Sequence, residues 1–137
     1  MPIDSSLIGA SSQPHTFEVT REAVMRFMQA TEDPALQVGG AEVEYAPPTF
    51  PTTFRLRVPG LELDGSKMQL IHGEQQYSYT RKLRVGEKIS CVARVADIRE
   101  RTGKSGPMTI VISEITGVDE QQQPVFTGRS TLIVREK

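Results

Sequence analysis

The residues that could do acid–base chemistry gather in one short stretch, His72-Gly73-Glu74, at the start of a run of strand-forming residues. A histidine and a carboxylate are side chains that often move protons near neutral pH. They stand two apart, so in a regular strand both side chains lie on one face. The glycine between them often marks a place where a ligand or another backbone comes close. His72 and Glu74 are therefore candidate catalysts, with the alternative that His72 is a structural group bonded to a backbone carbonyl.

Other groups that could have a role are scattered along the chain. Asp33 follows a predicted helix, where an acidic residue more often ends the helix than catalyses. Thr49 and Phe50 stand at the start of a second predicted helix, whose free N–H groups could polarise a substrate carbonyl. We therefore expect Thr49, Phe50, His72 and Gly73 to contact substrate. Two histidines and one cysteine, widely spaced, predict no metal site, and without a Gly-rich phosphate loop no cofactor is predicted.

The composition indicates a small domain with little net charge. A chain of 137 residues predicts one domain, residues 1–137, with 16 basic and 17 acidic side chains and a net charge of -1. Nothing in this balance indicates binding to nucleic acid or to an anionic membrane. The apolar stretches are too short to span a bilayer, and residues 1–13 do not resemble a signal peptide. The single cysteine, Cys91, stands in a strand pattern, so we expect a buried, inert thiol and a cytoplasmic protein.

The elements that must position these residues begin with a helix. An extended segment at 15–19 is followed by a predicted helix from Arg21 to Ala30. Thr20 is its expected N-cap, and apolar residues repeat at three and four along it. A helix with one apolar face packs that face against the rest of the domain.

A second helix is predicted from Thr49 to Val58. Phe50, Phe54 and Val58 stand four apart, which suits one apolar stripe, and prolines precede them as they often do at a helix start. The apolar share of this segment is high, so we expect a mostly buried helix.

From Met68 onward every periodic segment alternates as a strand does. Four long strand-like runs with short connections predict an antiparallel meander: 70–79, 88–99, 108–113 and 125–135. A buried helix needs a sheet that curves around it. We therefore expect an α+β fold, a single hot-dog domain in which a central helix is wrapped by a curved antiparallel β-sheet. Such a sheet leaves an exposed edge, so we expect the chain to associate through that edge.

Four segments, in this order, resemble the MaoC-like dehydratases: FEVTREAVMRFMQATEDP, APPTF, LIHGEQQYSYTRKLRVGEKI and STLIVRE. The likeness covers residues 3–136 and is closest to the N-terminal half of that family, the type related to the dehydratase of fungal fatty acid synthase. It implies a hot-dog fold that acts on coenzyme A or acyl-carrier-protein thioesters. It also implies interconversion of trans-2-enoyl and (R)-3-hydroxyacyl forms by an Asp–His pair, carried in a G-D-x-N-P-x-H loop after the first helix.

The chain departs from that loop at both catalytic positions. Aligning the motif's proline on Pro34 places Thr31 at the aspartate, Leu36 at the histidine and Asp33 at the asparagine. Threonine is no base near neutral pH, and leucine has no proton to exchange. Because the two motif positions lack acid–base groups, no residue is assigned as catalytic. His72, Glu74 and Asp33 stay as candidates.

The leading hypothesis is a non-catalytic or half-site subunit of an (R)-specific enoyl-thioester hydratase/3-hydroxyacyl-thioester dehydratase. A partner hot-dog would carry the Asp–His pair while this chain shapes the acyl tunnel. The expected assembly is a homodimer, or a heterodimer with such a catalytic hot-dog subunit. The last predicted strand ends close to Lys137, so we expect the partner to be a separate polypeptide. Two alternatives stay open. One is a self-sufficient homodimeric enzyme with a rearranged site around His72, and the other is an acyl-thioester binding module without turnover.

Overall fold

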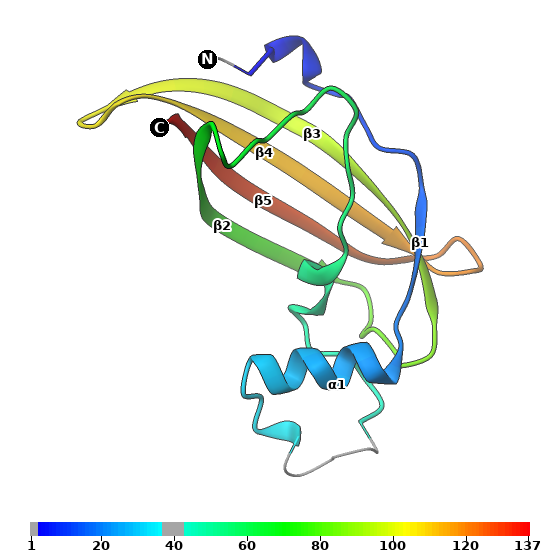
Figure 1. Ribbon diagram of the computed structural model, residues 1–137. Helices are drawn as coiled ribbons and strands as arrows, with labels where there is room; N and C mark the ends of the chain where they lie inside the picture. The colour runs from blue at the N-terminus through cyan, green and yellow to red at the C-terminus, as the bar shows by residue number, and fades with distance from the viewer. Residues whose placement is uncertain (1–2, 37–42) are drawn as a thin grey trace.

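The computed structural model describes residues 3–36 and 43–137 and has at its centre one curved antiparallel sheet (Figure 1). Its strands lie in the order β1-β3-β4-β5-β2. They are β1 (His15–Glu18), β2 (Met68–Tyr79), β3 (Lys88–Gly103), β4 (Gly106–Val118) and β5 (Pro124–Glu136). The predicted α+β class, a single hot-dog domain with a curved antiparallel sheet, is confirmed.

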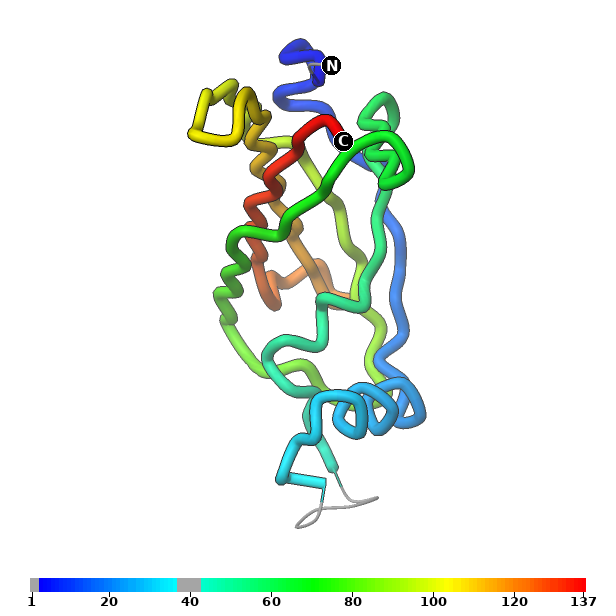
Figure 2. The backbone as a smooth tube through the Cα atoms, turned by 60° about the vertical axis from the view of Figure 1, so that its left-hand side comes forward, coloured from blue at the N-terminus to red at the C-terminus, as the bar shows by residue number. Residues whose placement is uncertain are grey.

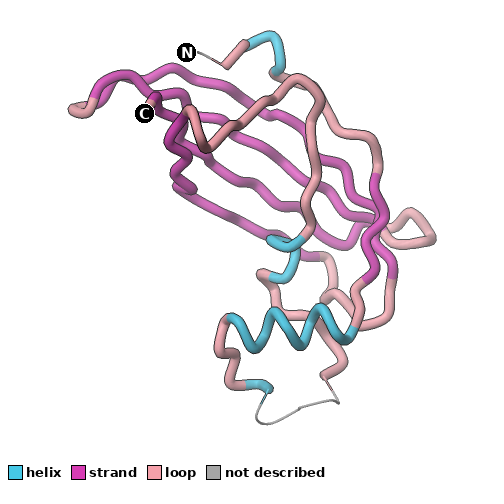
Figure 3. Tube along the Cα trace, in the orientation of Figure 1, coloured by secondary structure: helices cyan, strands magenta, loops and turns pink. Residues whose placement is uncertain are grey.

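The first predicted helix is present with the predicted bounds, α1 (Arg21–Ala30). Thr20 caps it, since its side chain accepts a hydrogen bond of 3.1 Å from the backbone N–H of Ala23. Val24 and Met28 are buried, as the apolar repeat predicts. The helix lies beyond the end of the sheet where β2 finishes, not within its curve (Figures 1 and 3). In residues 3–36 and 43–137, no helix is long and apolar enough to cross a membrane.

The predicted second helix, Thr49 to Val58, is wrong. The chain makes one 3₁₀ turn, Phe50–Thr53, and then becomes extended. The hydroxyls of Thr52 and Thr53 each donate to a backbone carbonyl three residues back, at 2.9 Å. Threonine side chains that bond to the local backbone compete with a regular helix, and β-branching adds to this preference.

Residues 54–63, here called the strap, cross the concave face of the sheet where a central helix was expected (Figures 1 and 2). Phe54 and Val58 are buried and Leu56 is half-buried, while the two arginines between them are exposed. This alternation has the period of two that belongs to an extended chain. The apolar spacing of four along this segment therefore fits both conformations, and the structure adopts the extended one.

The strap joins two separate apolar cores. Phe54 belongs to the core at the α1 end, where it stacks on Phe17 with ring centroids 4.6 Å apart. Val58 belongs to the core at the opposite end, with Val95 and Val111. Four extended residues span about 13 Å. The concave face between the two cores is covered by a single chain.

The two edges of the sheet differ in how they are covered. The chain before β1 runs along β3, where Gly9 N–H donates to Val95 O and Ser12 N–H donates to Ala93 O, both at 2.8 Å. β2 forms the other edge, and no described strand pairs with its outer side. Ile71, on β2, is 38% exposed. β2, with 12 residues against four for β1, is therefore the longer open edge of the described sheet.

An ion network holds the α1 end of the sheet together. Arg81, after β2, donates to both carboxylate oxygens of Glu87 at 2.7 and 2.9 Å, and to Asp119 at 3.3 Å. Glu87 also accepts from the backbone N–H of Arg84. Asp119 follows β4, so the network ties the β2–β3 connection to the β4–β5 hairpin.

We predict that Glu87→Gln destabilises the fold in a pH-dependent way. Burial acts to raise the pKa of Glu87, but the hydrogen bonds from Arg81 and Arg84 outweigh it and lower this pKa. A lowered pKa stabilises the fold above the unfolded-state pKa and loses that effect as pH falls through the folded one. The substitution should lower the free energy of unfolding by about 1–3 kcal/mol at neutral pH.

Urea titrations of both proteins between neutral pH and about pH 3 measure this difference. The gap should narrow as the solution becomes acidic. Glu22→Gln is the control, since Glu22 and Arg26 form an exposed pair whose loss should cost about 0.5 kcal/mol or less. Equal losses for the two variants would refute the structural role of Glu87.

We also predict that Cys91 is unreactive in the folded protein. Its side chain is fully buried, and burial raises its pKa to about 12. The thiolate is the reactive form, so a disulfide reagent near pH 8 should react on the order of 10²–10³-fold more slowly than in guanidinium chloride. Stopped-flow absorbance measures both rates, and similar rates would show that the thiol is accessible.

Candidate functional site

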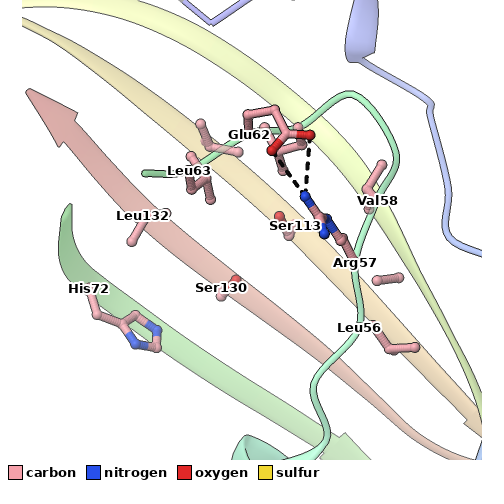
Figure 4. A pocket seen from close by; sticks show the side chains of 12 residues that line it. Leu56, Arg57, Val58, Glu62, Leu63, His72, Ser113, Ser130 and Leu132 are labelled. Carbon is pink, nitrogen blue, oxygen red and sulfur yellow. Dashed lines mark hydrogen bonds and ion pairs between the residues drawn. The ribbon is translucent and has the colours of Figure 1, made fainter. Parts of the chain in front are cut away.

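A cavity of about 470 Å³ lies between the strap and the concave face of the sheet (Figure 4). An α-helix with its side chains is about 10–12 Å across, and a single extended chain is thinner, so the strap leaves space beneath it. The apolar side chains around this large cavity come from both layers: Leu56, Val58, Leu61 and Leu63 of the strap, and Ala93, Val111 and Leu132 of the sheet.

A smaller cavity of about 170 Å³ continues toward the α1 end. It shares Leu56, Ala93, Ser113 and Ser130 with the large cavity. Tyr77 lines it beside a glycine of β5, Gly128, where a Cβ would lie 2.9 Å from the tyrosine ring. The glycine therefore makes room for this ring. The two cavities together are called the groove below.

His72 faces the large cavity from the edge strand β2 (Figure 4). Its Nε2 lies 3.1 Å from the backbone oxygen of Glu74, which makes Nε2 the hydrogen-bond donor. This is the backbone bond that the structural alternative for His72 predicts. The imidazole is exposed, so it is open to both solvent and groove.

The prediction that His72 and Glu74 share one face is wrong. A β-bulge leaves Gly73 without a cross-strand partner, so His72 lies opposite Leu132 and Glu74 lies opposite Thr131. Cross-strand partners share a face, and consecutive residues of β5 point to opposite faces. Leu132 lines the cavity. The Glu74 side chain is therefore on the convex face, away from His72.

The other predicted site residues lie outside the groove. Asp33 follows α1 and accepts a hydrogen bond of 3.0 Å from the N–H of Ala35. Phe50 is 1% exposed in the core, and Thr49 is exposed at the start of the 3₁₀ turn. Neither these two residues nor Gly73 lines either cavity. Of the predicted site residues, the structure brings His72 alone to the groove.

The two positions that align with the Asp–His pair hold side chains with structural contacts. Thr31 ends α1, and its hydroxyl donates to the carbonyl of Phe27 at 3.1 Å. Leu36 is half-buried and packs against the core at the α1 end. Neither residue lines the groove. The loop after the first helix therefore has no proton-transfer group at these two positions.

Among the described residues that line the large cavity, the titratable side chains are His72, Arg57 and Glu62. Arg57 and Glu62 pair with each other at 3.1 Å on the solvent side of the strap, with about 70–80% of each side chain exposed (Figure 4). Three possible metal ligands do not cluster anywhere in residues 3–36 and 43–137. The groove can therefore hold an apolar chain, but it lacks a carboxylate positioned to work with His72.

Two groove residues were missed from the sequence, Ser113 in β4 and Ser130 in β5. Both side chains point into the groove between apolar neighbours, as Ser113 does between Val111 and Ile115. The signal that could have found them is a polar residue at an inward position of an otherwise apolar alternation. Their proximity depends on strand register, which the sequence pattern does not give.

Comparison with known proteins agrees with this architecture. Residues 6–128 match the family described as FAS1-like, dehydratase domain region. A UPF0336 protein of Saccharopolyspora erythraea is 32% identical, and the alignment covers 98% of this chain and 93% of that protein.

Two solved structures share the fold. A C-terminally truncated HadBC (3R-hydroxyacyl-ACP dehydratase) complex from Mycobacterium tuberculosis superposes with a TM-score of 0.69 at 20% identity, over 97% of this chain and 99% of that one. A MaoC-like dehydratase superposes with a TM-score of 0.74 at 18% identity, over 96% of this chain and 43% of the other. The resemblance drawn from the four sequence segments is confirmed, and the chain belongs to the FAS1-like dehydratase domain family, on a hot-dog fold of the MaoC-like type.

Proposed function

We propose that this chain is a non-catalytic or half-site subunit of an (R)-specific enoyl-thioester hydratase/3-hydroxyacyl-thioester dehydratase. Its substrate is an acyl-CoA or acyl-carrier-protein thioester, and a partner hot-dog supplies the Asp–His pair. The observation that carries the proposal is an apolar groove whose one histidine, His72, has no carboxylate beside it.

The groove suits the acyl part of such a substrate. Its larger cavity, about 470 Å³, is within the usual range of ligand pockets, about 300–1,000 Å³. Leucine and valine side chains from the strap and the sheet face each other across it. Each methylene buried there contributes about 0.8 kcal/mol, so a long chain gains affinity from this lining without any specific bond.

The chemistry needs groups that the groove does not contain. Adding water across an enoyl double bond requires an acid–base pair around one water, and donors for the charge that builds on the thioester oxygen. Thr31 and Leu36 stand where the resemblance implies that pair, and their contacts are structural. The similarity to a chain of the HadBC complex, which is itself a dehydratase complex, supports a partner as the source of the pair.

The alternative of a self-sufficient site around His72 is weakened by the bulge at Gly73. Without Glu74 on the same face, His72 would have to act as both acid and base. Its Nε2 is also engaged by the backbone oxygen of Glu74. A histidine held in this way is suited to contact a ligand or partner, which is its role in this proposal.

We propose β2 as the surface that meets the partner. Its outer side carries unpaired backbone groups along a strand of 12 residues. At the other edge β1 has only four residues, and the chain before it bonds to β3. A long open edge needs pairing or covering. Pairing at β2 would continue the sheet into a second hot-dog domain and bring His72 close to the junction.

We predict that the chain alone hydrates crotonyl-CoA poorly or not at all, and that a co-purifying hot-dog protein with an intact D-x-N-P-x-H loop restores the reaction. Loss of acid–base help removes about 10²–10⁴-fold per group. Ultraviolet absorbance of the enoyl thioester measures the rate. In the complex, His72→Ala should change substrate affinity or assembly modestly while the maximal rate stays within a few-fold.

A different result would contradict the subunit proposal. If the chain alone is active, and His72→Ala abolishes that activity while circular dichroism shows an intact fold, then His72 is the catalyst. The subunit proposal would then be wrong.

The second prediction of this proposal concerns assembly. Ile71→Lys places a charge on the open edge and should weaken association at least about tenfold, because an edge charge opposes strand pairing. Ile8→Lys is the matched control, since Ile8 is 44% exposed and lies in the N-terminal segment, away from β2. Sedimentation velocity with and without the partner measures both variants. A monomer at micromolar concentration that also binds no hot-dog partner would contradict the edge assignment.

A further inference from the structure

Two serines mark the junction of the two cavities. Ser113 of β4 and Ser130 of β5 are direct cross-strand partners, so their Cβ atoms are about 4.5–5.5 Å apart. Both side chains line the large cavity and the small one. Figure 4 shows both hydroxyls on the floor of the large cavity, beneath the strap. This pair is called the serine pair below.

The hydroxyls of the serine pair are available to a ligand. Within residues 3–36 and 43–137, neither hydroxyl makes a hydrogen bond to another protein group. The same part of the chain has no fully buried side-chain polar atom without a partner. Both serines are half-buried, so their unpaired oxygens must open into the groove. A ligand lying in the groove would cover them.

Apolar side chains lie on both sides of the serine pair. Toward the far core the lining includes Leu61, Val111 and Leu132. Toward the α1 end it includes Phe54 and Ile115, together with the polar side chains of Gln75 and Glu114. A ligand that fills both cavities therefore meets mainly leucine and valine side chains in the large cavity, then two hydroxyls, then a mixed apolar and polar lining in the small cavity. A chain with matching chemistry has hydrocarbon in the large cavity and a polar group at the serine pair.

A plain hydrocarbon covering the serine pair would remove water from both hydroxyls and return no hydrogen bond, which is unfavourable. A chain oxygen would restore a bond, since each serine can donate to a keto oxygen and can also accept from a hydroxyl. Sites that bond a substrate hydroxyl discriminate strongly against analogues without it.

We propose that the groove selects acyl chains that carry a further oxygen, a hydroxyl or keto group beyond the 3-position of the thioester, held by Ser113 and Ser130. This inference rests on the proposed acyl-binding role and adds a substrate class to it. The polar amides of a pantetheine arm are a different source of oxygen. We assign the site to the acyl chain because the large cavity beside the pair is lined mainly by leucine, valine and alanine side chains.

The test is calorimetric binding of hexadecanoyl-CoA, of 3-hydroxyhexadecanoyl-CoA as the reference for the proposed function, and of a series of hydroxyhexadecanoyl-CoA isomers with the hydroxyl beyond carbon 3. The full-length chain is compared with a Ser113→Ala/Ser130→Ala variant, which removes both hydroxyls and little volume. Ser78→Ala is the matched control, since Ser78 is an exposed β2 serine opposite Thr127, outside both cavities. Thermal melts establish that each variant is folded.

The wild-type chain should bind at least one isomer with its hydroxyl beyond carbon 3 about fivefold to tenfold more tightly than the plain chain and the 3-hydroxy chain. The double-alanine variant should lose that preference and bind the plain chain as tightly as the wild type or more tightly. Ser78→Ala should behave as the wild type does.

Two results would overturn the proposal in distinguishable ways. If plain and hydroxylated chains bind equally to the wild type, or if the double variant weakens every CoA thioester alike, the oxygen preference is wrong while acyl binding stands. If no acyl-CoA binds at all, both this inference and the proposed acyl-binding function fail.

Discussion

The concave face of the sheet has to be covered, and in this protein a single extended segment covers it. Apolar side chains from all five strands contribute to the cores at that face, and exposing them to water would cost about 25 cal/mol for each Å². A helix in this place would fill the curve of the sheet. The strap shields the same face with less volume, and the groove is the space that results.

The covering of the concave face by one thin segment explains why the core is divided into two clusters. Phe54 anchors the strap among aromatic rings at the α1 end, and Val58 anchors it among valines and isoleucines at the other. Leu56, between the two anchors, covers the part of the sheet where the serine pair lies. The groove and the packed core are thus made from the same strands.

Much of the fold could be predicted from the sequence, because local signals agreed with the tertiary structure. Thr20 and the apolar repeat after it gave the bounds of α1, and strand alternation located β2 to β5. The segment from Phe50 to Val58 misled because its apolar spacing of four satisfies a helix and an extended chain alike. The two threonines after Phe50, whose hydroxyls bond to the backbone, were the signal against a helix.

The site was less predictable, since it depends on register between strands. The bulge at Gly73 separates His72 from Glu74. A glycine inside a strand permits a bulge, but whether one forms depends on the pairing of β2 with β5. Ser113 and Ser130 are far apart in the sequence and become neighbours only through the pairing of β4 with β5. Neither relation follows from the period of one strand taken alone.

The way the strap is attached has a consequence for how a ligand reaches the groove. Within the described chain, residues 55–60 make no backbone hydrogen bond to the sheet, so side-chain packing alone holds the strap there. Segments held in this way open at lower free energy than the hydrogen-bonded strands beneath them. A long chain can therefore be laid into the groove from the side while the strap is lifted, without being threaded from one end. The opening and closing of the strap would then set how bulky a ligand can enter the groove and how long that ligand stays bound.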